Sequence, residues 1–369
     1  MLRIGGLALN VLFDYTKSSI PPLLGGGDGG DDGDVEEEKI ASNYIRLRAV
    51  RGSLEKYGGV FSKIAQMLSY SDPESSTSYD ECKPFSRDKT HDWFMSYTED
   101  ADKPSVKYTV DKKIYKSGSV GQVYKGFYKD DSIAIKVLYR GLKESTQSDL
   151  DAIETLSSYM FGFMDLENGI KEVSSKVKEE LDYVHELKNT QKIYDLWKDD
   201  EVIVIPKPFG EICDSDVLAT QFIEGVSLTE FLKTATQEDK NLVGSNMIRF
   251  IFTNLYMWGI FYSDSHYGNI IITKDKRIAF IDFGCLHFIN ELMRINLVRL
   301  HRAIAINDKS LMKRYLCDLG ILSPGETSQE SIDYAMAYFS TQYKPWVTDS
   351  QFVFNNEWVK ITDKKNQKM

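Results

Sequence analysis

The sequence predicts an α+β protein of two lobes with a helical N-terminal extension, and three features carry this prediction. Residues 106–139 alternate apolar and polar side chains with a period of two, which is typical of successive strands. Beyond residue 225, apolar residues recur at the three-to-four-residue spacing of helices. Within that helical part, residues 260–284 form a strand–turn–strand pattern with three polar residues that no core requires.

These three polar residues are Asp264, Asn269 and Asp282, the last of which opens an Asp-Phe-Gly tripeptide behind an apolar run. Phosphoryl transfer uses such a set, because one carboxylate orients the nucleophile while an amide and a second carboxylate hold magnesium ions. Asn269 follows Asp264 by five positions (269 − 264), the spacing of a kinase catalytic loop. We therefore expect a protein-kinase-like fold; a plain β-hairpin with a solvated loop is the competing interpretation.

Composition restricts the class of protein. The chain has 369 residues, 42% of them hydrophobic, and a net charge of −10, which suits two lobes with a substantial core and argues against nucleic-acid binding. Its four cysteines are scattered, as in reduced intracellular proteins. No apolar run reaches the length of a transmembrane helix. We expect an intracellular protein, either cytoplasmic or peripherally associated with a membrane; for residues 1–13 a docking helix is favoured over a membrane-surface helix.

Changes in pattern along the chain divide it into five segments. A glycine- and aspartate-rich tract cannot bury apolar surface and is expected to be a flexible linker. The predicted segments are an N-terminal docking segment (1–24), this linker (25–38), a helical extension with a loop (39–105), a small lobe (106–224) and a helical large lobe (225–369).

The expected elements of the two lobes follow from the same patterns. Five strands are expected to form one sheet in the small lobe: 106–115, 121–128, 132–139, 202–205 and 217–222. Helices are expected at 143–163, 169–197, 227–233, 238–258, 290–307, 309–320 and 328–343, with a short helix near Trp93.

A glycine-containing turn and a lysine in an apolar strand suggest a phosphate site in the small lobe. Gly118 and Gly121 allow backbone amides to approach phosphate oxygens closely, although a hairpin that needs glycine for its geometry would look alike. Lys136 lies in the strand Ile-Ala-Ile-Lys-Val and needs a charged partner, unless it extends to solvent. Glu186, on the helix expected at 169–197, is the natural partner.

Several motifs together resemble those of the UbiB-type atypical kinases, a protein-kinase-like family linked to coenzyme Q biosynthesis. The likeness covers roughly residues 40–325. The motifs that carry it are Lys63-Ile-Ala-Gln66, the turn Lys116–Val123, Glu180-Leu-Asp182, Tyr262–Asn269 and Asp282-Phe-Gly284.

The resemblance implies an enzyme that uses ATP and Mg²⁺, an atypical kinase or ATPase. Its acceptor would be water or a small molecule, lipid or protein, with a quinone-pathway component among the candidates; the alternative is a nucleotide-binding pseudokinase that acts as a switch or scaffold. Asp264 and Lys136 would be catalytic, and Asn269 and Asp282 would bind the metal. The nucleotide would contact Gly118, Ser119, Val120, Gly121, Val123, Lys136, Glu186, Gln221 and Ile223. Lys63 and Gln66 would close over the site with Glu180 and Asp182.

The chain departs from the family pattern at three places. Ala65 stands where the family has glycine, the alanines of the family's loop are Lys116, Ser117 and Gly118, and Tyr262 replaces a histidine. The metal- and phosphate-binding groups are all present, which favours an active enzyme over an inactive one.

Overall fold

The computed structural model describes most of the chain beyond residue 86. The described residues are 87–99, 107–118, 120–147, 150, 178–179, 181–262, 267–325, 327–348, 352–354 and 358. They fall into two compact units. Unit 1 takes its described residues from Met1–Asp200, Val204–Gly225 and Ala279–Cys285, and unit 2 from Glu201–Ile203, Val226–Ile278 and Leu286–Met369. The helical extension and the linker expected before residue 87 lie outside the described residues.

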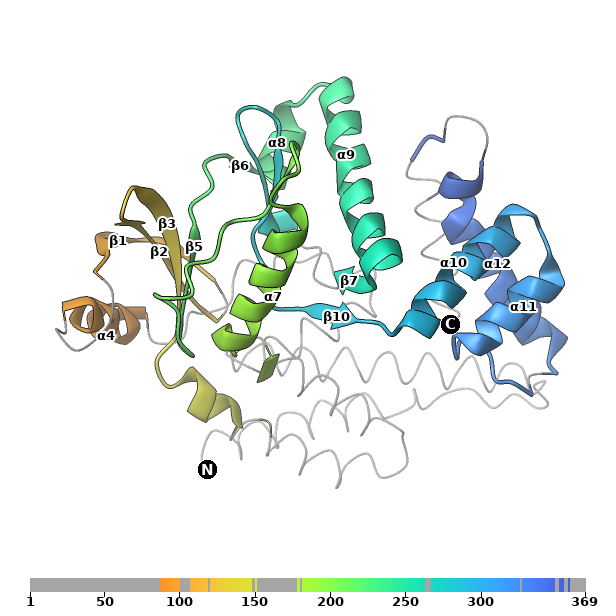
Figure 1. The fold of residues 1–369 in the computed structure, drawn as a ribbon, viewed down its shortest axis with the longest axis horizontal. Coiled ribbons are helices and arrows are strands. Elements are labelled where there is room, and N and C mark those ends of the chain that lie inside the picture. The colour runs from red at the N-terminus through yellow and green to blue at the C-terminus, as the bar shows by residue number, and fades with distance from the viewer. Residues whose placement is uncertain are drawn as a thin grey trace, which may run out of the picture. The chain divides into compact units, whose positions relative to one another are not determined.

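The main sheet of unit 1 has four antiparallel strands in the order β1-β2-β3-β5 (Figure 1). They are β1 (Thr109–Ser117), β2 (Gly121–Tyr128), β3 (Asp131–Leu138) and β5 (Val217–Gln221). The alternating sequence explains this arrangement, since Ile133, Ile135 and Val137 bury one face of β3 while the edge strand β1 is mostly exposed and polar.

The expectation of a five-stranded sheet was wrong. The strand expected at 202–205 is the short β4 (Ile203–Val204), which belongs to a different sheet. Pro206 and Pro208 follow it directly, and proline has no N–H with which to continue a ladder. Pro208 forms only an isolated bridge with Thr220 of β5. In this bridge the Gln221 amide donates to the Lys207 carbonyl, and the Phe209 amide donates to the Ala219 carbonyl.

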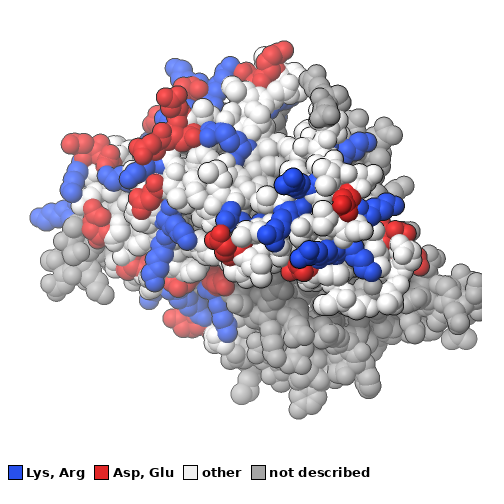
Figure 2. All heavy atoms as spheres, turned by 45° about the vertical axis from the view of Figure 1, so that its right-hand side comes forward, with Lys and Arg blue, Asp and Glu red and all other residues white. Residues whose placement is uncertain are grey.

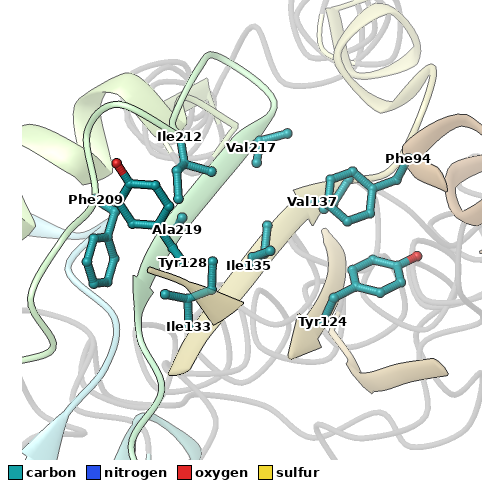
Figure 3. Close-up of a cluster of buried hydrophobic side chains, with 10 residues drawn as sticks. All are labelled: Phe94, Tyr124, Tyr128, Ile133, Ile135, Val137, Phe209, Ile212, Val217 and Ala219. Carbon is teal, nitrogen blue, oxygen red and sulfur yellow. The ribbon is translucent and has the colours of Figure 1, made fainter. Parts of the chain in front are cut away.

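The core of unit 1 lies between this sheet and the helix α4 (Arg87–Glu99), the short helix expected near Trp93. The rings of Phe94 on α4 and Tyr124 on β2 have centroids 4.8 Å apart, which is within the range of favourable aromatic contact. The buried side chains shown in Figure 3 are Phe94, Tyr124, Tyr128, Ile133, Ile135, Val137, Phe209, Ile212, Val217 and Ala219.

The helix α7 (Tyr183–Trp197) begins later than the expected helix at 169–197. Leu181 lies in a turn, and Asp182 has extended backbone angles (φ −114°, ψ 91°) that end helical geometry. The Asp182 carboxylate accepts a hydrogen bond from the Val184 amide at 3.0 Å, the usual way in which aspartate caps a helix N-terminus. Residues 169–177 lie outside the described part of the chain. α7 contacts β5 of the main sheet.

Unit 2 is mainly helical, as its sequence predicts. Each of its α-helices follows a Ser, Thr, Asn or Asp whose side chain accepts from the first-turn backbone. The helices are α8 (Leu228–Thr234), α9 (Gln237–Phe252), α10 (Glu291–Ala305), α11 (Lys309–Asp318) and α12 (Gln329–Val347), with the π-helix η1 (Thr253–Met257) directly after α9.

The core of unit 2 is formed by α10, α11 and α12. It includes the buried side chains of Leu300, Met312, Leu316, Ile332 and Met336. None of the helices in the described ranges is both long enough and apolar enough to cross a membrane. On the face drawn in Figure 2, Lys and Arg lie interspersed with Asp and Glu over the described atoms.

Short strands border the polar motif; of their residues Ala279 and Phe280 belong to unit 1 and the others to unit 2. β6 (Val226–Ser227) pairs with β8 (Ile270–Ile272), and β7 (Ile260–Tyr262) pairs with β10 (Leu286–Phe288). A turn in which the Thr273 amide donates to the Arg277 carbonyl joins β8 to β9 (Ile278–Phe280). All three residues of β9 are buried, which confirms the apolar strand expected before Asp282.

Candidate active site

Lys136 is placed by the register of the main sheet. It lies on β3 directly opposite Val123 of β2 and Leu218 of β5. Residues that face each other across antiparallel strands project to the same side of the sheet. Val123, one of the expected nucleotide contacts, therefore lies on the same face of the sheet as the Lys136 ammonium.

The Lys136 ammonium pairs with two carboxylates within unit 1. Its Nζ donates to Glu186 Oε1 at 2.5 Å and to Asp282 Oδ2 at 2.9 Å. The side chains of Glu186, Lys136 and Asp282 are 7%, 19% and 31% exposed, so Asp282 is the most accessible of the three. The expected partnership of Lys136 with Glu186 is thus present, and Asp282 of the Asp-Phe-Gly motif joins it.

Burial and charge shift the protonation of this cluster. Burial acts to lower the pKa of Lys136, but the carboxylates of Asp282 and Glu186 outweigh it, and the pKa of Lys136 lies well above its ordinary value. Burial and the Asp282 charge raise the pKa of Glu186 to about 7, against the opposing effect of Lys136. Two carboxylates around one ammonium leave one negative charge in excess, so Lys136 stays cationic near neutral pH.

The glycine turn before β2 is held by backbone contacts. The Gly118 amide donates to the Gly121 carbonyl at 2.8 Å, the Val120 carbonyl accepts from the Tyr139 amide at 3.0 Å, and the Tyr139 hydroxyl donates to the Gly118 carbonyl at 3.2 Å. A Cβ on Gly121 would lie 2.3 Å from the Val137 carbonyl oxygen, so the approach of β3 alone requires glycine there. A Cβ on Gly118 would meet only the Gly121 oxygen, at 3.7 Å, so strand packing does not explain that glycine. Sequence reasoning missed Tyr139.

Two side chains of α7 bind the backbone of the Asp-Phe-Gly segment. Glu186 accepts a hydrogen bond from the Phe283 amide, and Asn189 Nδ2 donates to the Phe283 carbonyl at 2.9 Å. The Gly284 amide donates to Asp282 Oδ1 at 3.1 Å. Sequence reasoning missed Asn189, although a polar residue three positions after Glu186 on a buried helix face was the available signal.

Four of the other predicted residues, Asp182, Gln221, Ile223 and Asn269, are among the described residues. Asp182 caps α7, which gives its carboxylate a local structural role. Gln221 is exposed, and its backbone amide donates a hydrogen bond to the Lys207 carbonyl. Ile223 is half-buried and lies just beyond the end of β5. Asn269 ends the short 3-10 helix η2 (Tyr267–Asn269) in unit 2 and is half-buried. Lys63, Gln66, Ser119, Glu180 and Asp264 lie outside the described residues.

The donors present suit a magnesium nucleotide. Among the described residues, no group of three or more His, Cys, Asp or Glu side chains could hold a metal unaided. Magnesium in phosphoryl-transfer sites is usually bound by one or two protein carboxylates together with substrate phosphates and water. The partly exposed Asp282 carboxylate beside the Lys136 ammonium provides such an oxygen ligand next to a positive charge for phosphate.

Comparison with known proteins places this chain in a family. Residues 78–316 match the model of the ABC1 atypical kinase-like domain, which is most of the chain. The chain is 29% identical over 217 residues to Protein ACTIVITY OF BC1 COMPLEX KINASE 3, chloroplastic, from Arabidopsis thaliana, covering 56% of this chain and 30% of that protein. It is 26% identical over 256 residues to Atypical kinase COQ8, mitochondrial, from Saccharomyces cerevisiae, covering 68% and 51% of the two chains.

A solved structure shares the fold. The structure titled as the complex of Rv3197 with erythromycin from Mycobacterium tuberculosis aligns with a TM-score of 0.61 at 20% identity, covering 92% of this chain and 94% of that one. The chain spans about half the length of the curated relatives it matches, from 30% to 61% among those compared. The matched domain and the kinase-like fold agree with the resemblance seen in the sequence, and the chain belongs to the ABC1 atypical kinase-like family.

Proposed function

We propose that this chain is an atypical kinase or ATPase that binds MgATP and transfers the γ-phosphoryl group. The observation that carries the proposal is the cluster of Lys136 with Glu186 and Asp282, in which a buried lysine on β3 is held by a helix glutamate and by the aspartate of Asp-Phe-Gly. Phosphoryl-transfer enzymes of the kinase type need this lysine–glutamate pair and this aspartate together. If these three positions served stability alone, apolar side chains would stabilise the fold equally well.

Each side chain has a role in the proposed reaction. Lys136 neutralises phosphate oxygens, Glu186 orients Lys136, Asn269 and Asp282 hold Mg²⁺, and Asp264 orients the attacking hydroxyl or water. Bound magnesium would supply neutralisation of the charge that develops on the phosphates. The turn Gly118–Gly121 and Val123 would cover the nucleotide, with Gln221 and Ile223 beside its base, and Lys63, Gln66, Glu180 and Asp182 would restrict access to the site.

We propose the phosphoryl acceptor only as a chemical class. Water, a small molecule, a lipid or a protein would each be activated by the same catalytic aspartate. Relatives carry names such as Atypical kinase COQ8, mitochondrial, and we propose by analogy an acceptor in quinone or lipid metabolism, with the protein acting inside the cell or at a membrane surface. Because the chain spans only part of its relatives, the activity of those whole proteins is an analogy here.

Turnover by an Asp264→Asn variant tests the proposal. Removing the carboxylate that orients the nucleophile should lower the rate of ATP turnover by roughly 10²–10⁴-fold while leaving the melting temperature unchanged. Asp275→Asn is the matched control: Asp275 is an exposed residue in the turn between β8 and β9, where its carboxylate accepts only a local hydrogen bond from Thr273. Undiminished turnover in Asp264→Asn would contradict the mechanism.

The alternative is a nucleotide-binding switch without chemistry. It predicts that MgATP binds with ordinary affinity but that turnover by the wild-type protein equals that of a Lys136→Met variant. Binding and turnover measured on the same preparation separate the two functions.

A further inference from the structure

Both backbone polar groups of Phe283, its N–H and its carbonyl, are hydrogen-bonded by side chains of one helix, α7. The N–H donates to the Glu186 carboxylate, and the carbonyl accepts from Asn189 Nδ2 at 2.9 Å. Glu186, Asn189 and Phe283 are 5%, 4% and 1% exposed, so water does not compete for these groups. Helix residues three apart lie on the same face, which is why Glu186 and Asn189 both reach the backbone of Phe283.

These two hydrogen bonds lie next to Asp282, the proposed metal ligand. Phe283 stands between Asp282, whose Oδ2 bonds Lys136, and Gly284, whose amide bonds Asp282 Oδ1. Rotating the peptide plane before Phe283 would break the bond to Glu186, and rotating the plane after it would break the bond to Asn189. Buried backbone groups without partners are costly, so the two hydrogen bonds favour one orientation of the segment.

We propose that Asn189 is a positioning residue for phosphoryl transfer: through the Phe283 carbonyl it holds Asp282 in place to bind the metal. The inference rests on the proposed function for its catalytic consequence, but the positioning itself is a property of unit 1 alone. Asn189 makes no contact with the ammonium or carboxylates of the cluster in the hydrogen bonds described above, so it acts through the backbone.

Hydrogen exchange tests the positioning without nucleotide. In the full-length Asn189→Leu variant, which keeps the branched shape of the side chain but removes the donor, backbone amides of residues 281–286 should exchange at least about tenfold faster than in the wild type. Thr190→Val is the matched control: Thr190 is the next residue on α7, equally buried, and its hydroxyl donates only to the Glu186 carbonyl within the helix at 2.7 Å. The control should leave exchange at 281–286 unchanged.

Magnesium dependence tests the consequence. At saturating ATP, the Mg²⁺ concentration for half-maximal turnover should rise about tenfold in Asn189→Leu and remain at the wild-type value in Thr190→Val. A purely structural role would move both variants together in proportion to their melting temperatures. Asn189→Ser, which is too short to reach the Phe283 carbonyl but stays polar, gives the same comparison if the leucine variant does not fold.

Two results would overturn the proposal. The first is exchange at 281–286 that is no faster in Asn189→Leu and Asn189→Ser than in Thr190→Val. The second is faster exchange with an unchanged magnesium dependence, since Asp282 would then not depend on Asn189. Hydrogen exchange needs neither nucleotide nor turnover. If the wild type showed no turnover, that result would count against the proposed function, but the exchange rates at residues 281–286 would still test whether Asn189 positions this segment.

Discussion

Among single residues, Lys136 combines electrostatics and proposed chemistry, because its ammonium is the counter-charge for two carboxylates, Glu186 and Asp282. Removing one partner of a buried ion pair costs more stability than replacing both partners by apolar residues, since the remaining charge stays buried without compensation. Lys136 therefore affects both the proposed chemistry and the stability of the fold, and the two effects need to be measured separately.

We expect Lys136→Met to destabilise the metal-free protein in a pH-dependent way. The folded-state pKa of Glu186 is about 7, above its ordinary value of about 4.3, so its protonated form favours the folded state and this contribution is lost as pH rises from about 4.3 through 7. Loss of the ammonium raises that pKa further. The free energy of unfolding should fall by about 3–5 kcal/mol at pH 8 and by less at pH 5.5.

Urea denaturation with a chelator present measures this effect. Lys143→Met is the control, because Lys143 pairs with Asp216 near the surface at 2.6 Å and its loss should cost only about 0–1 kcal/mol. An equal loss of stability for Lys136→Met at both pH values would show that Glu186 does not titrate as described.

Cys213 should resist alkylation in the folded protein. Burial raises the pKa of its thiol to about 11, so little of the reactive thiolate exists at pH 8.5. The Sγ also accepts from the Ala219 amide at 3.2 Å and donates to the Phe209 carbonyl at 3.2 Å, which fixes it in the core. Mass spectrometry after iodoacetamide treatment should show the Cys213 peptide unmodified without urea and modified with it. Rapid labelling without urea would mean that this region opens readily.

Of the helices and strands, those with a long, regular pattern were predicted well. The bounds predicted for β2 and β3 lie within one residue of the observed bounds. Each helix predicted in unit 2 begins close to the Ser, Thr, Asn or Asp that caps the observed helix. Errors arose where a local feature overrode the pattern. Pro206 and Pro208 keep β4 out of the main sheet, and the Asp182 cap starts α7 after the periodic pattern had already begun.

The helices of unit 2 contain a half-buried aromatic cluster that should respond to pH. The His301 ring of α10 lies 4.8 Å from the Tyr343 ring of α12, and the hydroxyls of Tyr256 and Tyr343 are 3.0 Å apart. Burial lowers the pKa of His301 below its ordinary value of about 6.5. The contribution of this residue to stability is therefore present above about pH 6.5 and is lost as pH falls through the folded-state pKa.

A His301→Phe variant checks this contribution. Phenylalanine keeps an aromatic ring in the cluster and cannot take up a proton, so the melting temperature of the variant should fall less than that of the wild type between pH 7.5 and pH 5.5. If the two proteins lose the same number of degrees, His301 is not a source of acid sensitivity.

For the chain as a whole, the sequence predicted the residues of the candidate site better than the contacts among them. Lys136, Glu186 and Asp282 were identifiable because lysine in an apolar strand and Asp-Phe-Gly after one are unusual in a core. The pairing of Lys136 with Glu186 was predicted, whereas the contact of Lys136 with Asp282, 146 positions away, was not, because short-range patterns do not encode it. Asn189 went unnoticed because one buried asparagine in a helix resembles ordinary packing until its partner, the Phe283 carbonyl, is known.

The proposed function requires that this kinase-like domain binds MgATP through Lys136 and Asp282. A thermal-unfolding scan of the full chain with and without MgATP, beside Asp282→Asn, measures this binding. Ligand at a hundred times its dissociation constant stabilises a protein by about 2.7 kcal/mol, which raises the melting temperature of a domain of this size by about 2–4 °C. We predict such a shift in the wild type, dependent on magnesium and lost in Asp282→Asn. No shift at millimolar nucleotide, or an equal shift in the variant, would contradict the claim.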